Sequence, residues 1–316
     1  MFIWELNFLK LNVLLLNFLL VMSIPESQLS TWSNQGAQVG SQTTHKSIRR
    51  ALATYTWPER MGYDVYLQGS YANYTNIRGN SDVDIIVETQ SIYYDNLTQS
   101  EQEQLGWIRG DFSWSDFRGE VIKALVSYYG GKYVDTSGGK SVKVLASGNR
   151  LAADVIPCAQ YKWYEDLKVV AEGVTFWDRK NNSQIVNYPK LHRKNGAAKN
   201  SYGRTRELYK PSIRIFKNAR DRLVRDTPSL EGLYPSYFVE CLLFNTADSC
   251  FSGDYQDVFV AILNDLLERI KNDGIDDFVT QSGRHWLFGS HSVQWNKRDA
   301  LDYVYRLVDL WNDWYQ

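Results

Sequence analysis

The sequence predicts an α+β protein whose first part combines strands with helices and whose second part is helical. Short runs of alternating, β-branched residues occur between positions 64 and 156, whereas apolar residues after position 205 recur at the spacing of amphipathic helices. The chain has 316 residues, of which 44% are hydrophobic and 22% charged, as in folded globular proteins. The sequence has no internal repeat and no long low-complexity tract, so one large or two modest domains are expected.

In the first part, glycine, proline and polar residues separate the expected elements. A helix near 44–56 ends before Pro58, and residues 71–81 are rich in the polar residues that form loops. The pair Gly148-Asn149 between two apolar runs indicates a β-hairpin. The expected order is helix 44–56, strand 64–68, turn 69–70, strand 82–88, helix 115–129, and hairpin strands 141–147 and 151–156.

The second part follows a helical pattern. Helices are expected near 205–225, 236–250, 254–273 and 297–315. Residues 160–200 indicate mixed structure with a polar loop around Asn181. We therefore place a core domain at 22–200 and a helical domain at 201–316.

The first 21 residues are apolar but irregular. Glu5 and Lys10 interrupt the run and no small-residue cleavage site follows, so neither a membrane-spanning helix nor a signal peptide fits. Met22 opens a more ordinary sequence, and we expect translation to begin there. Residues 1–21 are then an upstream extension without membrane association, and the alternative is a membrane-associated helix.

Charge and cysteine content exclude several classes of protein. The formal net charge of −1 argues against a general polyanion binder. Cys158, Cys241 and Cys250 form no CxxC pair and the four histidines are scattered, so neither a disulfide framework nor a zinc module is expected. Buried thiols in the cytoplasm are the expectation.

One segment departs from the overall charge balance. Residues 190–225 contain twelve Lys or Arg against Glu207 and Asp221. Such a block is either a solvated helix face or a surface that holds triphosphates or RNA.

Three aspartates are candidate metal ligands. Side chains at i and i+2 of a strand point the same way, so Asp82 and Asp84 present two carboxylates together. Asp154 lies in an otherwise apolar strand, where an unpaired carboxylate is costly, and it is the candidate third ligand. Carboxylate oxygens suit Mg²⁺, and two such ions assist nucleotide transfer from a triphosphate.

Gly69-Ser70 supplies the second half of the candidate site. A glycine lets the backbone approach phosphate, and a serine hydroxyl with neighbouring N–H groups can hold phosphate oxygens. Each feature has a simpler explanation: a turn, a solvated strand edge, or a salt-bridged aspartate. Their order along the chain, a β-run, Gly-Ser, Asp-Val-Asp on a strand and a later lone Asp, favours the site.

This combination resembles a known family. The stretch from Leu67 to Ile86, LQGSYANYTNIRGNSDVDII, is similar to the signature of the bacterial cGAS/DncV-like nucleotidyltransferases (CD-NTases) of cyclic-oligonucleotide anti-phage signalling (CBASS). Asp154-Val-Ile-Pro157 resembles their third-aspartate strand. The resemblance covers most of residues 22–316 and implies a polymerase-β-like core, a mixed sheet with helices, joined to a C-terminal helical domain, with nucleotides in the cleft between them.

The resemblance also implies roles for residues that the pattern alone does not single out. Gln68, Gly69 and Ser70 are expected to contact nucleotide, and Lys217 resembles the family lysine that grips the donor triphosphate. Ser236-Tyr237 resembles the family's Ser-Tyr pair, in which serine contacts phosphate and tyrosine stacks on the donor base. A solvated Lys217 and a core Tyr237 are the alternatives.

We therefore expect a Mg²⁺-dependent nucleotidyltransferase, with two ions on Asp82, Asp84 and Asp154, that makes a cyclic di- or trinucleotide from nucleoside triphosphates, ATP among them. The product would act on a separate effector protein. Direct activation by DNA is not expected, because no His/Cys zinc insertion like that of the animal DNA sensor is present.

Two other functions compete with this one. The first is a linear oligonucleotide synthetase or an AMP-transferring enzyme, although the long helical part argues against the small antitoxin type. The second is a nucleotide-sensing module without catalysis, against which the three intact aspartates count.

Overall fold

The computed structural model describes residues 23–77, 82–108, 110–272, 274–290 and 294–315. The chain divides into two compact units, which we call the helical unit (residues up to 35, 75–77, and 192 to the end) and the sheet unit (residues 36–74 and 78–191). The later boundary between these units lies at 191/192, and the helical unit also contains two earlier segments; the domain division at 200/201 stays a prediction. The predicted extension, residues 1–21, lies outside the described residues.

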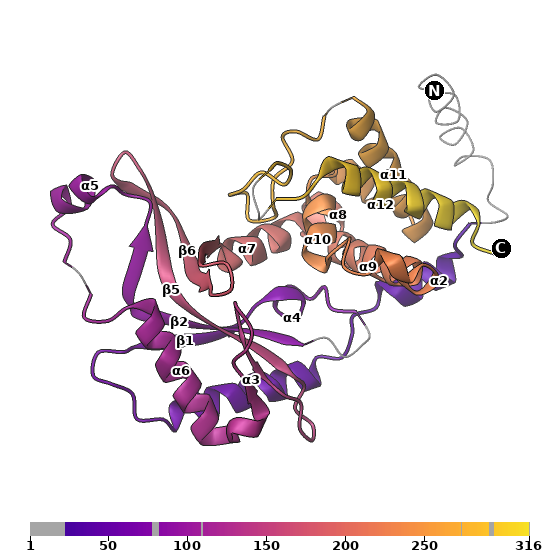
Figure 1. Cartoon of the computed structure of the whole chain (residues 1–316). Coiled ribbons are helices and arrows are strands. Elements are labelled where there is room, and N and C mark those ends of the chain that lie inside the picture. Colours follow the sequence, from indigo (N-terminus) through magenta and orange to yellow (C-terminus); the bar gives the residue numbers. More distant parts are fainter. Residues whose placement is uncertain (1–22, 78–81, 109, 273, 291–293, 316) are drawn as a thin grey trace. The chain divides into compact units, whose positions relative to one another are not determined.

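The sheet unit contains a seven-stranded mixed sheet (Figure 1). One path runs in the order β1-β2-β5-β4-β3, while β6 pairs with β5 and β7 with β6. Only β2 and β5 pair in parallel; the other pairs are antiparallel, including the predicted hairpin of β4 and β5. The strands are β1 (Tyr63–Leu67), β2 (Val83–Asp95), β3 (Val134–Asp135), β4 (Val142–Val144), β5 (Ala153–Glu165), β6 (Lys168–Asp178) and β7 (Ser183–Asn187).

Two helices, α3 (Val39–Ala53) and α6 (Trp114–Tyr129), cover one face of this sheet. Ser113 begins α6 with a capping box, in which its side chain accepts from the Asp116 amide. The apolar sides of both helices pack on alternate residues of β2 and β5, and the buried cluster includes Ile48, Leu52, Phe117, Val121, Val83, Ile85 and Val155. The opposite side chains of β2 and β5 therefore point away from this core. Shorter helices are α4 (Gly69–Asn73) and α5 (Gln99–Gln104), with a 3₁₀ turn at Gly131–Tyr133.

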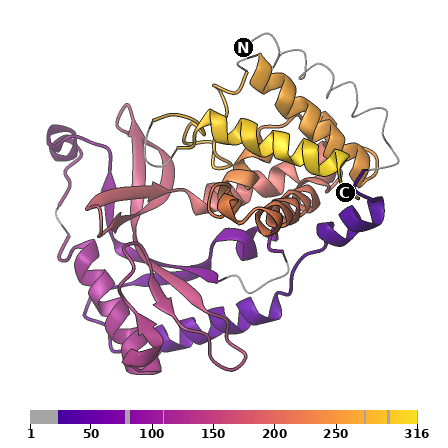
Figure 2. The ribbon, with the colours of Figure 1, turned by 45° about the vertical axis from the view of Figure 1, so that its right-hand side comes forward.

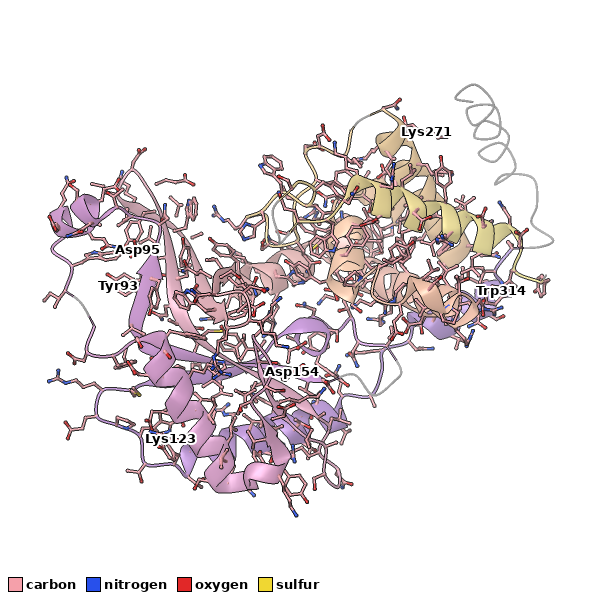
Figure 3. All side chains as sticks on the ribbon, in the orientation of Figure 1. Tyr93, Asp95, Lys123, Asp154, Lys271 and Trp314 are labelled. Atoms are coloured by element: carbon pink, nitrogen blue, oxygen red, sulfur yellow. The ribbon has the colours of Figure 1, made fainter. Side chains whose placement is uncertain are left out.

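Figure 2 shows the helices of the helical unit packed against one another. Their core is rich in aromatic residues. The ring of Phe259 on α11 contacts the rings of Phe216 on α9 and Trp311 on α12. Trp314, labelled in Figure 3, lies close to the C-terminal end, and its ring is edge-on to that of Trp32, with centroids 5.4 Å apart. The helices are α2 (Glu26–Ser33), α7 (Pro189–Lys199, which begins in the sheet unit), α8 (Tyr202–Thr205), α9 (Tyr209–Asp226), α10 (Ser236–Phe244), α11 (Tyr255–Lys271) and α12 (Lys297–Asn312), with 3₁₀ turns at Pro228–Leu230 and Asp248–Cys250.

The predicted α+β class is confirmed, and most predicted elements occur with shifted ends. The expected loop at 71–81 is only partly a loop, because α4 continues to Asn73. Residues 160–200, expected to be mixed, hold the end of β5 together with β6, β7 and α7. No helix in the described part of the chain has the length and hydrophobicity needed to span a membrane.

Candidate active site

Gly69 joins the end of β1 to α4 directly against the carboxylate strand. The Gln68 amide donates to the Asp84 carbonyl at 2.9 Å, which aligns the turn with β2. Gly69 has a φ of +67°, and a Cβ at this position would lie 2.3 Å from Asp84 Oδ2. Only glycine accommodates both the left-handed backbone and this close approach.

The sheet places the three predicted aspartates on one face. Val83 and Ile85 are buried on the opposite face, so Asp82 and Asp84 point away from the helix-covered core. Asp84 is the register partner of Asp154 across the parallel β2–β5 pair. Neighbouring strands lie about 4.8 Å apart, so these two side chains start from adjacent positions. Figure 3 labels Asp154 on the sheet.

Two of the aspartates have polar partners that the sequence analysis missed. Lys143 Nζ lies 2.5 Å from Asp82 Oδ2, and the Ser141 hydroxyl donates to Asp154 Oδ1 at 3.0 Å. The hydrogen bond to Asp82 raises the pKa of Lys143. The predicted hairpin could have identified Lys143, because Lys143 is the direct register partner of Asp154 across its two strands.

The residue types and the register fit a hard divalent cation, but the side chains are not gathered as a ligand set. Within the described residues, no group of three or more His, Cys, Asp or Glu side chains is arranged to hold a metal ion. The Asp82 carboxylate is turned to Lys143, and Asp154 to Ser141. Metal binding would therefore require the Asp82 carboxylate to leave Lys143 while the backbone stays in place.

Gln68 offers a polar atom without a protein partner beside this face. Its side-chain Oε1 is buried and, across the described ranges, no atom donates a hydrogen bond to it. Unpaired buried acceptors are costly and rare, so a ligand or water donor is expected there. Gln68 and Gly69 therefore lie against Asp84, and Ser70 follows Gly69 within α4; their contact with nucleotide stays a prediction.

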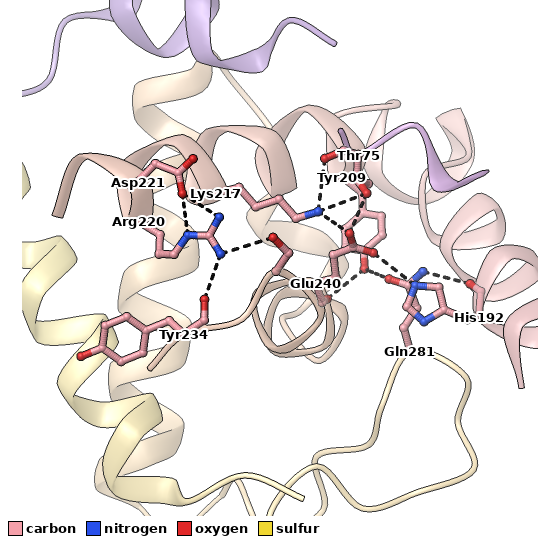
Figure 4. A network of polar contacts seen from close by, with 10 residues as sticks. Thr75, His192, Tyr209, Lys217, Arg220, Asp221, Tyr234, Glu240 and Gln281 are labelled. Carbon is pink, nitrogen blue, oxygen red and sulfur yellow. Dashed lines mark hydrogen bonds and ion pairs between the residues drawn. The ribbon is translucent and has the colours of Figure 1, made fainter. Parts of the chain in front are cut away.

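In the helical unit, the predicted Ser236 begins α10 after Pro235. Arg220 donates to the Ser236 hydroxyl at 3.3 Å and to the Tyr234 carbonyl at 3.0 Å (Figure 4). Its side chain keeps 15% exposure and pairs with Asp221. A guanidinium and a helix N-terminus thus meet at Ser236, and both favour an anion.

Tyr237 has aromatic neighbours on α7 and on the loop before α12. Its ring stacks on His192 at a centroid distance of 5.2 Å and 24°, and lies 5.7 Å from the tilted ring of Trp295. The residue remains 42% exposed, which leaves part of it accessible for stacking. Sequence reasoning missed His192 and Trp295 because both are distant from Tyr237 along the chain.

Lys217 is placed differently from the predicted phosphate contact. It is 1% exposed, and its ammonium pairs with Glu240 and donates to Thr75 (Figure 4). Burial alone would raise the pKa of Glu240, but Lys217 and His192 together lower it below its ordinary value. The structure therefore displays a buried ion pair at Lys217, and the phosphate contact stays a prediction.

A mixed sheet that carries Asp-x-Asp beside a Gly-Ser turn, with a third aspartate in register on the next strand, defines a nucleotidyltransferase. Residues 194–312 match the family described as cGAS/DncV-like nucleotidyltransferase C-terminal helical domain. The chain is 44% identical over 301 residues to the cyclic UMP-AMP synthase of Rhodothermus marinus, covering 93% of this chain and 100% of that protein. It is 34% identical over 307 residues to a cyclic nucleotide synthase of Staphylococcus haemolyticus, covering 93% and 100%.

Solved structures give the same result. The Rhodothermus marinus c-UMP-AMP synthase with Apcpp and Upnpp matches with a TM-score of 0.86 at 44% identity, covering 93% of this chain and 98% of that one. The Elizabethkingia meningoseptica cyclic dinucleotide synthase with GTP and Apcpp matches with a TM-score of 0.74 at 30% identity, covering 90% and 98%. The chain belongs to the cGAS/DncV-like nucleotidyltransferases, as the sequence predicted.

Proposed function

We propose that the chain joins nucleoside triphosphates into a cyclic di- or trinucleotide and releases pyrophosphate. The observation that carries this proposal is the register of Asp84 with Asp154 beside Gly69, in a chain whose relatives are cyclic nucleotide synthases. ATP and UTP are the first candidate substrates, because the 44% identical relative is a cyclic UMP-AMP synthase.

Each linkage needs one phosphoryl transfer. The sugar hydroxyl of one nucleotide attacks the α-phosphorus of another, a new O–P bond forms, and the bond to the pyrophosphate oxygen breaks. Asp154, held by Ser141, accepts the hydroxyl proton as the bond forms. Two Mg²⁺ ions on Asp82, Asp84 and Asp154 would neutralise charge on the triphosphate and the departing pyrophosphate. The last transfer takes place within the linear product, where the free sugar hydroxyl attacks the α-phosphorus of the remaining triphosphate, closes the ring and releases a further pyrophosphate.

The remaining residues hold the donor. Gly69 and Ser70 contact its phosphates through their backbone N–H groups and the Ser70 hydroxyl, while the unpaired Gln68 Oε1 accepts a hydrogen bond from a donor group of the nucleotide. Ser236 and Arg220 supply a hydroxyl and a positive charge for phosphate, and Tyr237 stacks on the base. Lys217 is left out of this set, because its ammonium is buried against Glu240.

The cyclic product is a second messenger in anti-phage defence and acts on a separate effector protein. We place the reaction in the cytoplasm, in keeping with three free, buried cysteines. Nothing in the proposed site requires DNA as an activator.

The test is a product assay. Protein beginning at Met22 is incubated with Mg²⁺ and all four ribonucleoside triphosphates, and products are identified by mass spectrometry. We expect a cyclic dinucleotide or trinucleotide, and none from the Asp82→Ala/Asp84→Ala variant. Product from that variant would sink the metal assignment. A purely linear product would favour an oligonucleotide synthetase, and nucleotide binding without any product would favour a sensing module.

A further inference from the structure

The short segment Thr75–Ile77 links the two halves of the sheet site yet belongs to the helical unit. It starts five residues after Ser70 and ends five residues before Asp82. Thr75 and Asn76 are 1% and 2% exposed, so this link is packed rather than a free surface loop. The contacts that hold Thr75–Ile77 therefore also constrain the chain between Ser70 and Asp82.

The Lys217–Glu240 pair contacts both the carbonyl and the hydroxyl of Thr75. Lys217 Nζ donates to the Thr75 carbonyl at 3.2 Å and lies 3.3 Å from its hydroxyl oxygen. The Thr75 hydroxyl donates to Glu240 Oε1 at 2.6 Å, and the same carboxylate oxygen pairs with the Lys217 ammonium. The three donor directions of the ammonium are thereby directed at Glu240 and Thr75.

The same network involves three of the four residues at which the chain enters or leaves the helical unit. The unit's three segments border the sheet unit at Gln35, at Thr75 and Ile77, and at His192. Gln35 donates to Asn76 Oδ1 at 3.1 Å, and the His192 ring nitrogen Nε2 lies 3.2 Å from Glu240 Oε2. The boundary residues Gln35 and His192 are thus bonded to the link segment or to the carboxylate that holds it.

Further buried contacts involve Glu240 and its partner His192, and the Tyr209 hydroxyl lies 3.3 Å from the Glu240 carbonyl oxygen. Tyr209 donates to Gln281 Oε1 at 2.6 Å, and Gln281 donates to the His192 carbonyl at 2.9 Å (Figure 4). The side chains of Lys217 and Glu240 are 2% and 4% exposed, so neither charge has water to replace its partner. A buried pair of this kind is costly to build and costly to break on one side, whereas an apolar replacement of both partners is often tolerated.

We propose that Lys217 and Glu240 are positioning residues: their ion pair anchors the Thr75–Ile77 link and, through it, sets the spacing of Ser70 and Asp82. The proposal rests on the proposed function only for its kinetic readout. It differs from the family-based prediction in one measurable way. An anchor affects kcat at unchanged KM and is replaceable by an apolar pair, whereas a phosphate-gripping lysine affects KM and is not.

The test compares Lys217→Met, Glu240→Leu and the double variant with wild-type protein, and uses Arg225→Met as a matched control. Arg225 is a 69% exposed cation on the same helix. Each single variant should lose about tenfold or more in kcat and melt at lower temperature, because one buried charge is left unpaired. The double variant should recover to within a few-fold of wild type in both, with KM for nucleotide unchanged throughout, and the control should match wild type.

Three outcomes would overturn the proposal. A KM that rises in Lys217→Met and stays high in the double variant makes Lys217 a nucleotide ligand. Recovery of melting temperature without recovery of kcat means that the charges act on the reaction itself. Single variants with wild-type kcat make the pair purely structural.

Thr75 provides a milder test in case a single variant does not fold. Thr75→Val removes only the hydroxyl, and should lower kcat several-fold with KM unchanged, while Thr75→Ser should restore wild-type kcat. Wild-type kcat in Thr75→Val would contradict the proposal. If wild-type protein makes no product, the proposed function fails, and amide hydrogen exchange then tests the anchor alone. Exchange at residues 75–77 should speed up in Glu240→Leu and return toward wild type in the double variant; unchanged exchange in Glu240→Leu would overturn it.

Discussion

In the sheet unit, backbone pairing between strands sets the positions of Asp84 and Asp154. In the helical unit, contacts with side-chain partners set the positions of the Lys217 and Arg220 side chains. The strand register brings the two aspartates together whatever their rotamers. Lys217 and Arg220 lie three residues apart on one helix and carry the same charge, yet one is buried on Glu240 and the other reaches Ser236. Backbone geometry therefore fixes the first group of residues, and the chemistry of distant partners fixes the second.

The largest expected effect comes from a change that disturbs the backbone placement of the catalytic residues. Gly69→Ala places a Cβ 2.3 Å from Asp84 Oδ2, so the turn or the carboxylate must shift. A displacement of about 1 Å in a catalytic group costs about 100-fold, and we expect a loss of that order in kcat. The measurement is steady-state product formation together with the melting temperature.

Gly148→Ala is the matched control for this variant. Gly148 also has a positive φ, +57°, but nothing lies within 4 Å of a Cβ built there. It should lose stability through backbone strain, about 1 kcal/mol or more, and keep wild-type kcat. Equal kcat losses in the two variants would show that strain, rather than the approach to Asp84, explains the effect.

The contrast between the two units also explains what the sequence predicted. The two-residue period of a strand was sufficient to align Asp82 with Asp84, and the hairpin turn brought Asp154 onto the same sheet. Both rules act over a few residues, so they apply before the tertiary structure is known. Gly69 was found in the same way, because a turn between a β-run and a polar segment favours glycine.

The residues that escaped prediction depend on partners far away in the chain. The family resemblance, rather than the charge block at 190–225, singled out Lys217, and neither could show that Glu240, on another helix, buries it. Thr75 lies in a polar stretch with no local mark of its contact to that pair. The strands β6 and β7 were missed because charged, aromatic and polar residues at 160–187 obscure the alternation that identifies a strand.

A second prediction sharpens the side-chain half of the comparison. Arg220→Met removes the cation that contacts Ser236, and a charge-assisted hydrogen bond is worth about 1.5–3 kcal/mol. We therefore expect KM for nucleoside triphosphate to rise about tenfold or more, with a much smaller change in kcat. The Arg225→Met variant of the same helix controls for loss of charge alone. An unchanged KM in Arg220→Met would remove Arg220 from the donor site.

The smallest expected effect concerns Lys143, whose position depends both on strand register and on a side-chain partner. Register with Asp154 sets its position, but its ammonium contacts Asp82 through a partly exposed pair, 42% and 32% exposed, of a kind worth about 0–1 kcal/mol. The Lys143 ammonium that contacts Asp82 competes with a divalent cation for the same carboxylate. Lys143→Met should therefore lower the Mg²⁺ concentration for half-maximal activity about two- to threefold, with kcat at saturating Mg²⁺ unchanged.

Lys123→Met is the matched control for this last variant, because Lys123 forms a comparable ion pair with Glu120 on α6, at 2.7 Å, outside the predicted site. It should leave the Mg²⁺ titration unchanged. If Lys143→Met instead needs more Mg²⁺ than wild type, Lys143 does not compete with the cation but holds Asp82 in the geometry that the cation requires. The carboxylates would then depend on a side-chain partner as Lys217 does, and the distinction between the two units would no longer hold for Asp82.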